Sequence, residues 1–367
     1  MNNRYNTIIT GAGPAGLFCA IHASSAGKKV LILEKNPGAG KKLLLSGSGQ
    51  CNFTHTGNIT EFLKHYGTAA NFVKPALSAF TNIHLIEFLE SHGIKTVTRD
   101  DGKIFPASMK AQDILSLLLK LCGKNSVDIK YNAQVKSISH NETEFNVYTE
   151  NEKYIAENFV IAAGGSSYPS TGSSGDGFRL AASLGHSTTE ITTALTPLYL
   201  KDYKMGDLSG ISVKESRIII IRDNKKIISG NGDILFTPKG LSGPGILDFS
   251  RYARNGDRIT ISLTEKRLEE IESLLQEILK SEGKKTIRNI LKILEIPERL
   301  IDSLLAYASI NPSKRAGEIS RTERNCIISL ISAFPFEIES KGDFRVAMAT
   351  AGGVIREEID RKTMQSK

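Results

Sequence analysis

Short apolar runs at the start of the chain alternate with glycine-containing turns. Tyr5–Thr10 and Lys29–Leu33 have the composition of buried strands, and Ala15–Ala26 between them has apolar residues at helical spacing and ends at Gly27. A strand, a helix and a second strand within about 30 residues form the smallest parallel crossover unit. The chain is therefore predicted to begin with such a unit, with Gly11–Gly16 as its first turn.

The pattern then changes from helical to strand-like. Pro37–Asn52 is rich in glycine and serine and predicts a loop, whereas Leu77–His92 and Ala111–Leu121 carry apolar residues at helical spacing. Across residues 127–160 apolar and polar positions alternate, as they do in half-buried strands. Asn158–Ala163 is predicted to be the last strand of this first region.

A second region begins near residue 190. Residues 192–263 are rich in Thr, Val and Ile and predict strands, whereas residues 265–305 and 323–333 have helical spacing. We therefore expect residues 191–345 to form a separate domain with a β part and a helical part. A short apolar strand, Val346–Ala351, then returns to the first region.

The composition is that of an ordinary globular chain, with 40% hydrophobic and 23% charged residues in a length that allows two or three domains. The 47 basic and 39 acidic side chains give a net charge of +8, and this excess is spread along the chain without a long basic run. We interpret it as a solvated basic surface. The alternative is a patch that attracts anionic nucleotides or RNA.

Cysteine usage and the N-terminus indicate a cytoplasmic protein. The four cysteines, at positions 19, 51, 122 and 326, are too far apart for a Cys-X-X-Cys pair, a zinc site or a disulfide framework. No cleavable apolar segment precedes the first strand, and no apolar run approaches the ~18–20 residues of a membrane span. We therefore expect no signal peptide, no membrane association and no metal.

The first turn has glycines at the spacing of a dinucleotide-binding turn. One glycine makes the tight turn, a second lets the backbone approach a pyrophosphate, and a third packs the helix on the strand, while the helix start supplies N–H donors. A carboxylate at the end of the second strand suits the ribose hydroxyls. The residues that this motif predicts are Gly11, Gly13, Pro14, Ala15, Gly16, Glu34 and Lys35. A purely structural turn is the alternative.

Later segments favour FAD over NAD. Gly-Pro-Ala-Gly with a downstream Glu is commoner in flavoproteins with two dinucleotide-binding domains than in simple dehydrogenases. Val135 is interpreted as part of an isolated strand that places a backbone group at an adenine edge, and residues 160–165 as a strand-and-glycine segment that returns to the cofactor. The loop that follows is long enough to be functional or disordered. It adds the candidates Ala163, Gly164, Gly165, Gly175 and Asp176, of which Asp176 either binds a cofactor hydroxyl or caps the next helix.

Six segments resemble one known family in order and spacing. They are Lys41–Asn52, Phe105–Ser108, Ala163–Gly177, Leu195–Leu198, Phe236–Pro244 and Thr350–Val354. Together they resemble the bacterial flavoproteins described as BaiN-like or aminoacetone-oxidase-like NAD(P)/FAD-dependent oxidoreductases, from residue 5 to the end of the chain.

The resemblance implies an α/β fold in which a Rossmann-type FAD-binding domain is interrupted by a β-barrel-like domain and a small helical domain. We place the FAD-binding domain at residues 1–190 and 346–367, the β-rich domain at 191–264 and 326–345, and the helical domain at 265–325. The loop Ser46–Asn52 is implied to lie beside the flavin. The cofactor-binding candidates from these segments are Lys42, Ser46, Gly47, Gly49, Gln50, Cys51, Asn52, Gly352 and Gly353.

This chain departs from the family pattern at two places. Gln50 stands where the pattern often has Arg, so one cationic contact to substrate or cofactor is expected to be absent. The pattern also continues past Lys367 with a segment like Gly-Leu-Tyr-Phe-Ala-Gly-Glu that normally contacts the flavin. We favour a truncated chain over a protein without this flavin wall, and expect such a fragment to fold poorly and to bind FAD weakly.

Catalytic residues are not identified by spacing. Cys51 is the one candidate, and we favour a small packing residue over a reactive thiol because no second cysteine accompanies it. The seven histidines form no constellation, so structural roles are expected for them.

The function expected from these residues is FAD-dependent two-electron transfer between NAD(P)H, or a small organic substrate, and flavin. The loop at 164–177 does not have the Gly-X-Gly-X-X-Gly order of a second dinucleotide-binding turn, so NAD(P)H would dock only transiently over the flavin. The alternative is that a substrate amine or a steroid-like alkene exchanges electrons directly with the flavin. Two other functions remain open. One is an RNA-associated flavoprotein that uses the basic residues of the helical block, although nucleic acid is not the expected partner, and the other is a non-catalytic flavin-binding scaffold.

Overall fold

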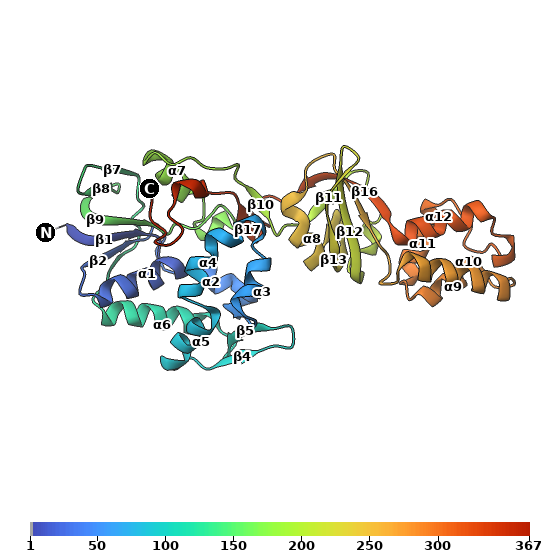
Figure 1. Ribbon diagram of the computed structural model, residues 1–367, viewed down its shortest axis with the longest axis horizontal. Helices are drawn as coiled ribbons and strands as arrows, with labels where there is room; N and C mark the ends of the chain where they lie inside the picture. Colours follow the sequence, from blue (N-terminus) through green and yellow to red (C-terminus); the bar gives the residue numbers. More distant parts are fainter. Residues whose placement is uncertain (1–2) are drawn as a thin grey trace. The chain divides into compact units, whose positions relative to one another are not determined.

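The structure is a computed structural model that describes residues 3–367. It divides into two compact units, Met1–Ile191 with Gly352–Lys367 and Thr192–Ala351. Each unit is described by itself, and Figure 1 shows the elements of both. Among residues 3–367, no helix is both long enough and apolar enough to cross a bilayer.

The first unit is built on a six-stranded sheet with the order β6-β2-β1-β9-β8-β7. Four neighbouring strands are parallel, and β7 and β8 join antiparallel at one edge. The strands are β1 (Arg4–Thr10), β2 (Val30–Leu33), β6 (Asp128–Lys130), β7 (Ser137–His140), β8 (Phe145–Tyr148) and β9 (Lys153–Ile161). The predicted βαβ unit is thus present, with α1 (Pro14–Ser25) as its helix.

Alternating side chains divide the sheet between two apolar layers. Ile9 and Ile32 point into a core shared with α1 and α6 (Ala111–Lys124), whereas Ile8 and Leu31 point into a core on the opposite face. Leu180 of α7 (Asp176–Ser183) belongs to that second core. Burial on both faces explains why these parallel strands are continuously apolar.

A helical lobe with a small three-stranded sheet completes the first unit. Its strands, in the order β3-β5-β4, are β3 (Thr54–His55), β4 (Thr96–Thr98) and β5 (Lys103–Pro106). Its helices are α2 (Lys41–Leu45), α3 (Ile59–Lys64), α4 (Ala70–Ala79) and α5 (Asn82–Ser91). The expectation of one helix over Leu77–His92 was wrong, because α4 ends at Ala79 and Thr81 caps a new helix by accepting a hydrogen bond from the His84 N–H.

The second unit combines a closed barrel with five α-helices. The barrel order is β11-β14-β13-β12-β15-β16, formed by β11 (Leu198–Leu200), β12 (Ser212–Arg222), β13 (Lys225–Thr237), β14 (Gly240–Ser242), β15 (Arg258–Ile261) and β16 (Phe334–Lys341). The helices after β15 are α9 (Leu268–Ser281), α10 (Ile287–Leu291), α11 (Glu298–Tyr307) and α12 (Arg321–Ser332), and α8 (Pro244–Phe249) lies against β13. The barrel interior and these helices share one apolar core.

A two-stranded ladder of β10 (Thr192–Ala194) and β17 (Ala349–Ala351) stands where the chain enters and leaves the second unit. The second unit is therefore an insertion between two parts of the first. The expected fold class is confirmed: a Rossmann-type domain is interrupted by a β-barrel and a small helical part.

Candidate functional site

A cavity of about 480 Å³ opens at the carboxyl ends of β1, β2 and β9. This is the edge at which open parallel sheets bind ligands, and the volume lies within the usual ~300–1,000 Å³ of small-molecule sites. The sequence-predicted residues that line it are Gly11, Gly13, Pro14, Ala15, Glu34, Lys35, Lys42, Val135, Ala163, Gly164 and Asp176.

The three glycines of the first turn have different surroundings. A Cβ on Gly11, whose φ is +102°, would lie 2.5 Å from the Ala162 carbonyl oxygen, and a Cβ on Gly16 would lie 2.0 Å from the Gly11 carbonyl oxygen. Side chains are therefore excluded there by backbone packing. A Cβ on Gly13 would meet nothing within 4 Å. Gly13 borders the cavity, so its missing side chain leaves space for a ligand rather than for the protein.

The first turn of α1 is free to bind an anion. Gly13 occupies the N-cap position without a side-chain hydrogen bond, and Pro14 follows at the first helical position. The first N–H groups of the helix are therefore not satisfied by a capping side chain, and they begin at the wall of the cavity. Such groups bind phosphate oxygens in dinucleotide-binding folds.

Glu34 is buried, and its carboxylate holds the backbone of the site together. One oxygen accepts a 2.7 Å hydrogen bond from the Ala12 N–H, and the other accepts from the main-chain and side-chain nitrogens of Asn36 at 2.8 and 2.7 Å. The carboxylate therefore couples the glycine turn to the end of β2. We expect it to offer its remaining acceptor capacity to a ribose hydroxyl.

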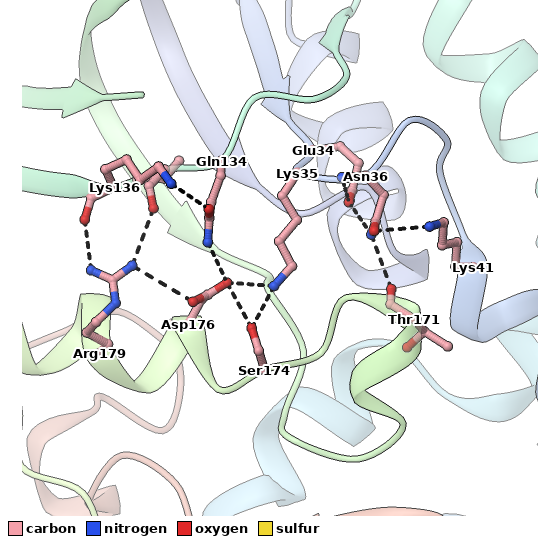
Figure 2. A network of polar contacts seen from close by, with 11 residues as sticks. Glu34, Lys35, Asn36, Lys41, Gln134, Lys136, Thr171, Ser174, Asp176 and Arg179 are labelled. Carbon is pink, nitrogen blue, oxygen red and sulfur yellow. Dashed lines mark hydrogen bonds and ion pairs between the residues drawn. The ribbon is translucent and has the colours of Figure 1, made fainter. Parts of the chain in front are cut away.

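Figure 2 shows a polar network beside these residues that joins β2 to the start of α7. The Lys35 ammonium donates to the Ser174 hydroxyl and to the Asp176 carboxylate, both at 2.7 Å, and Gln134 donates to the same carboxylate at 3.3 Å. Partial burial raises the pKa of Asp176, but the hydrogen bond and charge of Lys35 outweigh this, so the pKa lies below its usual value. Gly175 holds the N-cap position of α7, so Asp176 is a network residue rather than the cap.

The loop before α7 closes another side of the cavity. The Asn36 side-chain amide donates to the Thr171 carbonyl at 3.1 Å, and Lys41 donates to the Asn36 amide oxygen at 3.2 Å. A Cβ on Gly172, whose φ is +96°, would lie 2.4 Å from the Asn36 amide nitrogen. Only glycine at position 172 therefore allows this loop to approach the end of β2.

Lys42 is a half-buried cation in the cavity wall, on the short helix α2 within the segment that was expected to be an uninterrupted loop. Burial lowers the pKa of Lys42, and the side chain makes no hydrogen bond or ion pair with any residue in 3–367. A desolvated cation without a protein partner suits a ligand that brings its own negative charge.

The loop Ser46–Asn52 does not line this cavity. Gly47, Ser48, Gly49 and Cys51 all have positive φ, which gives the loop its tight path. The Cys51 side chain is 1% exposed and packs in the core with α1 and α6. Burial raises the pKa of the Cys51 thiol, partly offset by a hydrogen bond with Ser46. A buried, protonated thiol does not suit a nucleophile.

Val135 lines the cavity, but it is buried in the loop before β7 rather than in a strand, and its carbonyl accepts a hydrogen bond from Arg179. Other predicted residues lie elsewhere. Gly352 and Gly353 adjoin residues 189–190: Gly353 exchanges hydrogen bonds with Thr189, and a Cβ on Gly352 would lie 2.2 Å from the Glu190 carbonyl oxygen. The predicted residues outside the cavity lining are Gly16, Ser46, Gly47, Gly49, Gln50, Cys51, Asn52, Gly165, Gly175, Gly352 and Gly353.

Several lining residues were missed by the sequence prediction, among them Asn36, Lys41, Gln134, Thr171, Gly172 and Ser173. Asn36 and Lys41 follow the predicted Glu34 and Lys35 closely, and residues 171–173 lie in the loop that was expected to be either functional or disordered. These five residues could have been predicted, because each lies close to a predicted residue or within a loop that was already named. For Gln134 only its place beside Val135 pointed to the cavity.

Comparison with known proteins gives one family for the chain. A family model described as "HI0933-like protein Rossmann domain" matches residues 5–367. The chain is 29% identical to a ribosomal RNA dihydrouridine synthase of Escherichia coli (strain K12), covering 99% of this chain and 89% of that one. It is 26% identical to a 3-dehydro-bile acid delta(4,6)-reductase of Clostridium scindens, covering 98% and 89%.

Among solved structures, one match is the 3-ketosteroid-delta4-(5alpha)-dehydrogenase from Rhodococcus jostii RHA1. The two chains are 10% identical, with 99% of this chain and 88% of that one covered and a TM-score of 0.43.

Proposed function

Because the chain belongs to the HI0933-like family of Rossmann-domain flavoproteins, we propose that it is an FAD-dependent reductase of a carbon–carbon double bond conjugated to a carbonyl group. The cavity supports the cofactor part of this proposal. It offers an uncapped helix start, the open face of Gly13 and the unpaired cation of Lys42 to a dinucleotide.

The substrate part of the proposal is supported by the names of two relatives, because both names refer to the same type of chemical bond. Dihydrouridine is uridine whose C5–C6 double bond, conjugated to the C4 carbonyl, has been reduced. In a 3-dehydro-bile acid the delta(4,6) double bonds are conjugated to the 3-oxo group. The two names therefore refer to different molecules that contain the same kind of bond, a carbon–carbon double bond conjugated to a carbonyl group. Each of the two relatives aligns with nearly the whole chain.

Bound FAD would supply the hydride for such a reduction, with NADH or NADPH as the source of electrons. The residues of this chain bind and orient the cofactor. Glu34, the Lys35–Asp176 pair and Asn36 hold the walls of the cavity together, while Lys42 and the start of α1 offer positive charge and N–H donors to the phosphates.

A small-molecule substrate is favoured over RNA by the charge of the helical block. Residues 265–325 contain twelve basic and eleven acidic side chains, so this block is nearly neutral. Arg288 is also paired with Glu298 and Asp302, and Lys314 with Glu323. Phosphate backbones are bound by surfaces with a clear excess of positive charge, and this nearly neutral block does not have one.

The test is an anaerobic flavin titration. We expect the purified protein to show flavin absorption after FAD is added, and NADH or NADPH to bleach it. A 3-oxo-4,6-diene steroid should then restore the oxidised spectrum, whereas the saturated 3-oxo steroid should not. Reoxidation by a uridine-rich ribosomal RNA fragment, but not by the steroid diene, would identify RNA as the substrate. A flavin that neither nicotinamide reduces would contradict the proposed enzyme.

A further inference from the structure

Arg99 is held beside the loop Ser46–Asn52 by two contacts. It lies in the turn between β4 and β5, where its N–H donates to the Lys103 carbonyl at 2.9 Å. Its Nη2 donates to the Gln50 Oε1 at 2.6 Å, and its guanidinium carbon lies 4.1 Å from the centroid of the buried Phe105 ring. A cation over an aromatic face and a hydrogen bond at its edge together restrict the orientation of the guanidinium.

The fixed guanidinium keeps most of its donors for another group. It has five N–H donors, and the Gln50 contact is the one hydrogen bond that its side chain makes within residues 3–367. Arg99 is an exposed residue, so these donors can reach solvent or a ligand. Asp101, two residues along the chain, does not occupy them, because its carboxylate is hydrogen-bonded to the ammonium and the main-chain N–H of Lys103.

The Arg99–Gln50 contact also accounts for a departure in the sequence. Gln50 stands where the pattern of similar flavoproteins often has Arg, and the chain was therefore expected to lack a cation there. In the structure Gln50 is the acceptor that holds the Arg99 guanidinium at this place. A positive charge is therefore present beside position 50, and it comes from the turn between β4 and β5.

We propose that Arg99, positioned by Gln50, binds an oxoanion of the substrate, either a carboxylate or a phosphate, beside the loop Ser46–Asn52. The guanidinium fork matches both groups in geometry and charge. This inference rests on the proposed function and on the implication of the family resemblance that the loop Ser46–Asn52 lies beside the flavin. Arg99 would orient the substrate through its charged end and would take no part in hydride transfer.

The experiment measures anion binding directly. The FAD-bound protein is labelled with ¹⁵N-arginine, and the Nε–H signal of Arg99 is assigned by its loss in Arg99→Ala. Benzoate, neutral benzamide and inorganic phosphate are titrated separately. We expect benzoate or phosphate to shift the Arg99 signal. The dissociation constant of that anion, followed by the flavin absorption, should rise about tenfold or more in Arg99→Ala, as for loss of a charge-assisted hydrogen bond. The benzamide constant should not change.

Two further variants test whether a cation at this place, rather than positive charge elsewhere on the surface, binds the anion. Gln50→Arg combined with Arg99→Ala places a cation on the loop itself, close to where the Arg99 guanidinium lay. We expect the dissociation constant of the anion in this double variant to be within about threefold of the parent value. Arg299→Ala removes an exposed charge from α11 and should leave all three constants unchanged. The relative affinity of benzoate and phosphate shows which oxoanion the site prefers.

The outcomes separate this inference from the proposed function. Absence of any Arg99 shift with either anion, or equal weakening of benzoate and benzamide in Arg99→Ala, would overturn the role of Arg99. Loss of flavin reduction with Arg99-dependent anion binding intact would instead contradict the proposed enzyme, because the arginine signal does not depend on flavin chemistry.

Discussion

The Lys35 ammonium nitrogen lies 2.7 Å from Oδ2 of Asp176, and this contact joins two positions 141 residues apart in the sequence. Lys35 follows β2, and Asp176 begins α7, so the pair ties the second strand of the sheet to the helix after the last parallel strand. Both side chains are about three-quarters buried at the edge of the cavity. Figure 2 shows that Ser174 contacts both side chains and that Gln134 donates to the Asp176 carboxylate.

We predict that Asp176→Asn destabilises the protein at neutral pH and has little effect in acid. The folded-state pKa of Asp176 lies below its unfolded value, so its stabilising effect is present above the unfolded pKa of about 3.9 and is lost as the pH falls through the folded pKa. Thermal melting from pH 7 to pH 3 measures this. The exposed Asp248, for which residues 3–367 provide no ion pair, is the control as Asp248→Asn. A difference between Asp176→Asn and the parent that persists unchanged at pH 3 would contradict the prediction.

Gly13→Ala and Gly16→Ala should fail in different ways. The added Cβ at position 16 would lie 2.0 Å from the Gly11 carbonyl oxygen, so we expect Gly16→Ala to lower the unfolding midpoint in urea with or without FAD. At position 13 the Cβ meets no protein atom within 4 Å and enters the space of the ligand. Gly13→Ala should therefore fold like the parent without FAD and bind FAD at least about tenfold more weakly, as expected when a close backbone–pyrophosphate approach is blocked. Normal FAD affinity in Gly13→Ala would place the pyrophosphate elsewhere.

Lys42→Met is predicted to weaken cofactor binding while sparing or raising the stability of the protein without cofactor. Burial lowers the pKa of Lys42, which means that its charge is unfavourable in the folded state until an anion arrives. Loss of a charge-assisted contact to phosphate corresponds to about a 10- to 100-fold weaker FAD affinity. Fluorescence titration with FAD and melting of the protein without FAD check the two effects. Lys28→Met, at an exposed position, is the control, and parallel losses of stability and affinity in Lys42→Met would indicate a structural role instead.

Thiol labelling should distinguish Cys51 from a redox cysteine. Cys326 is exposed, whereas Cys51 and Cys122 are buried and burial raises the pKa of both thiols. We expect a thiol reagent at pH 8 to modify Cys326 first and to reach Cys51 and Cys122 only on unfolding. Cys51→Ser should retain reduction of bound FAD by the preferred nicotinamide. Rapid labelling of Cys51 in the folded protein, together with loss of flavin reduction in Cys51→Ser, would restore it as a catalytic candidate.

The sequence by itself was sufficient for the features that depend on local pattern. The apolar runs of β1 and β2, the helical spacing of α1 and the three glycines between them specify a dinucleotide-binding turn, because each is set by the geometry of a few consecutive residues. Glu34 could be placed at the end of β2 for the same reason. The change of pattern near residue 190 marked the inserted part of the chain.

Only the tertiary structure decided which distant side chains meet. Asp176 meets Lys35 because α7 starts beside the end of β2, and Cys51 packs in one core with α1 and α6. Arg99 donates a hydrogen bond to Gln50, 49 residues away in the sequence. Such pairings depend on how whole elements pack, which local periodicity does not encode, and for that reason the walls of the site could not be derived from the turn that identifies it.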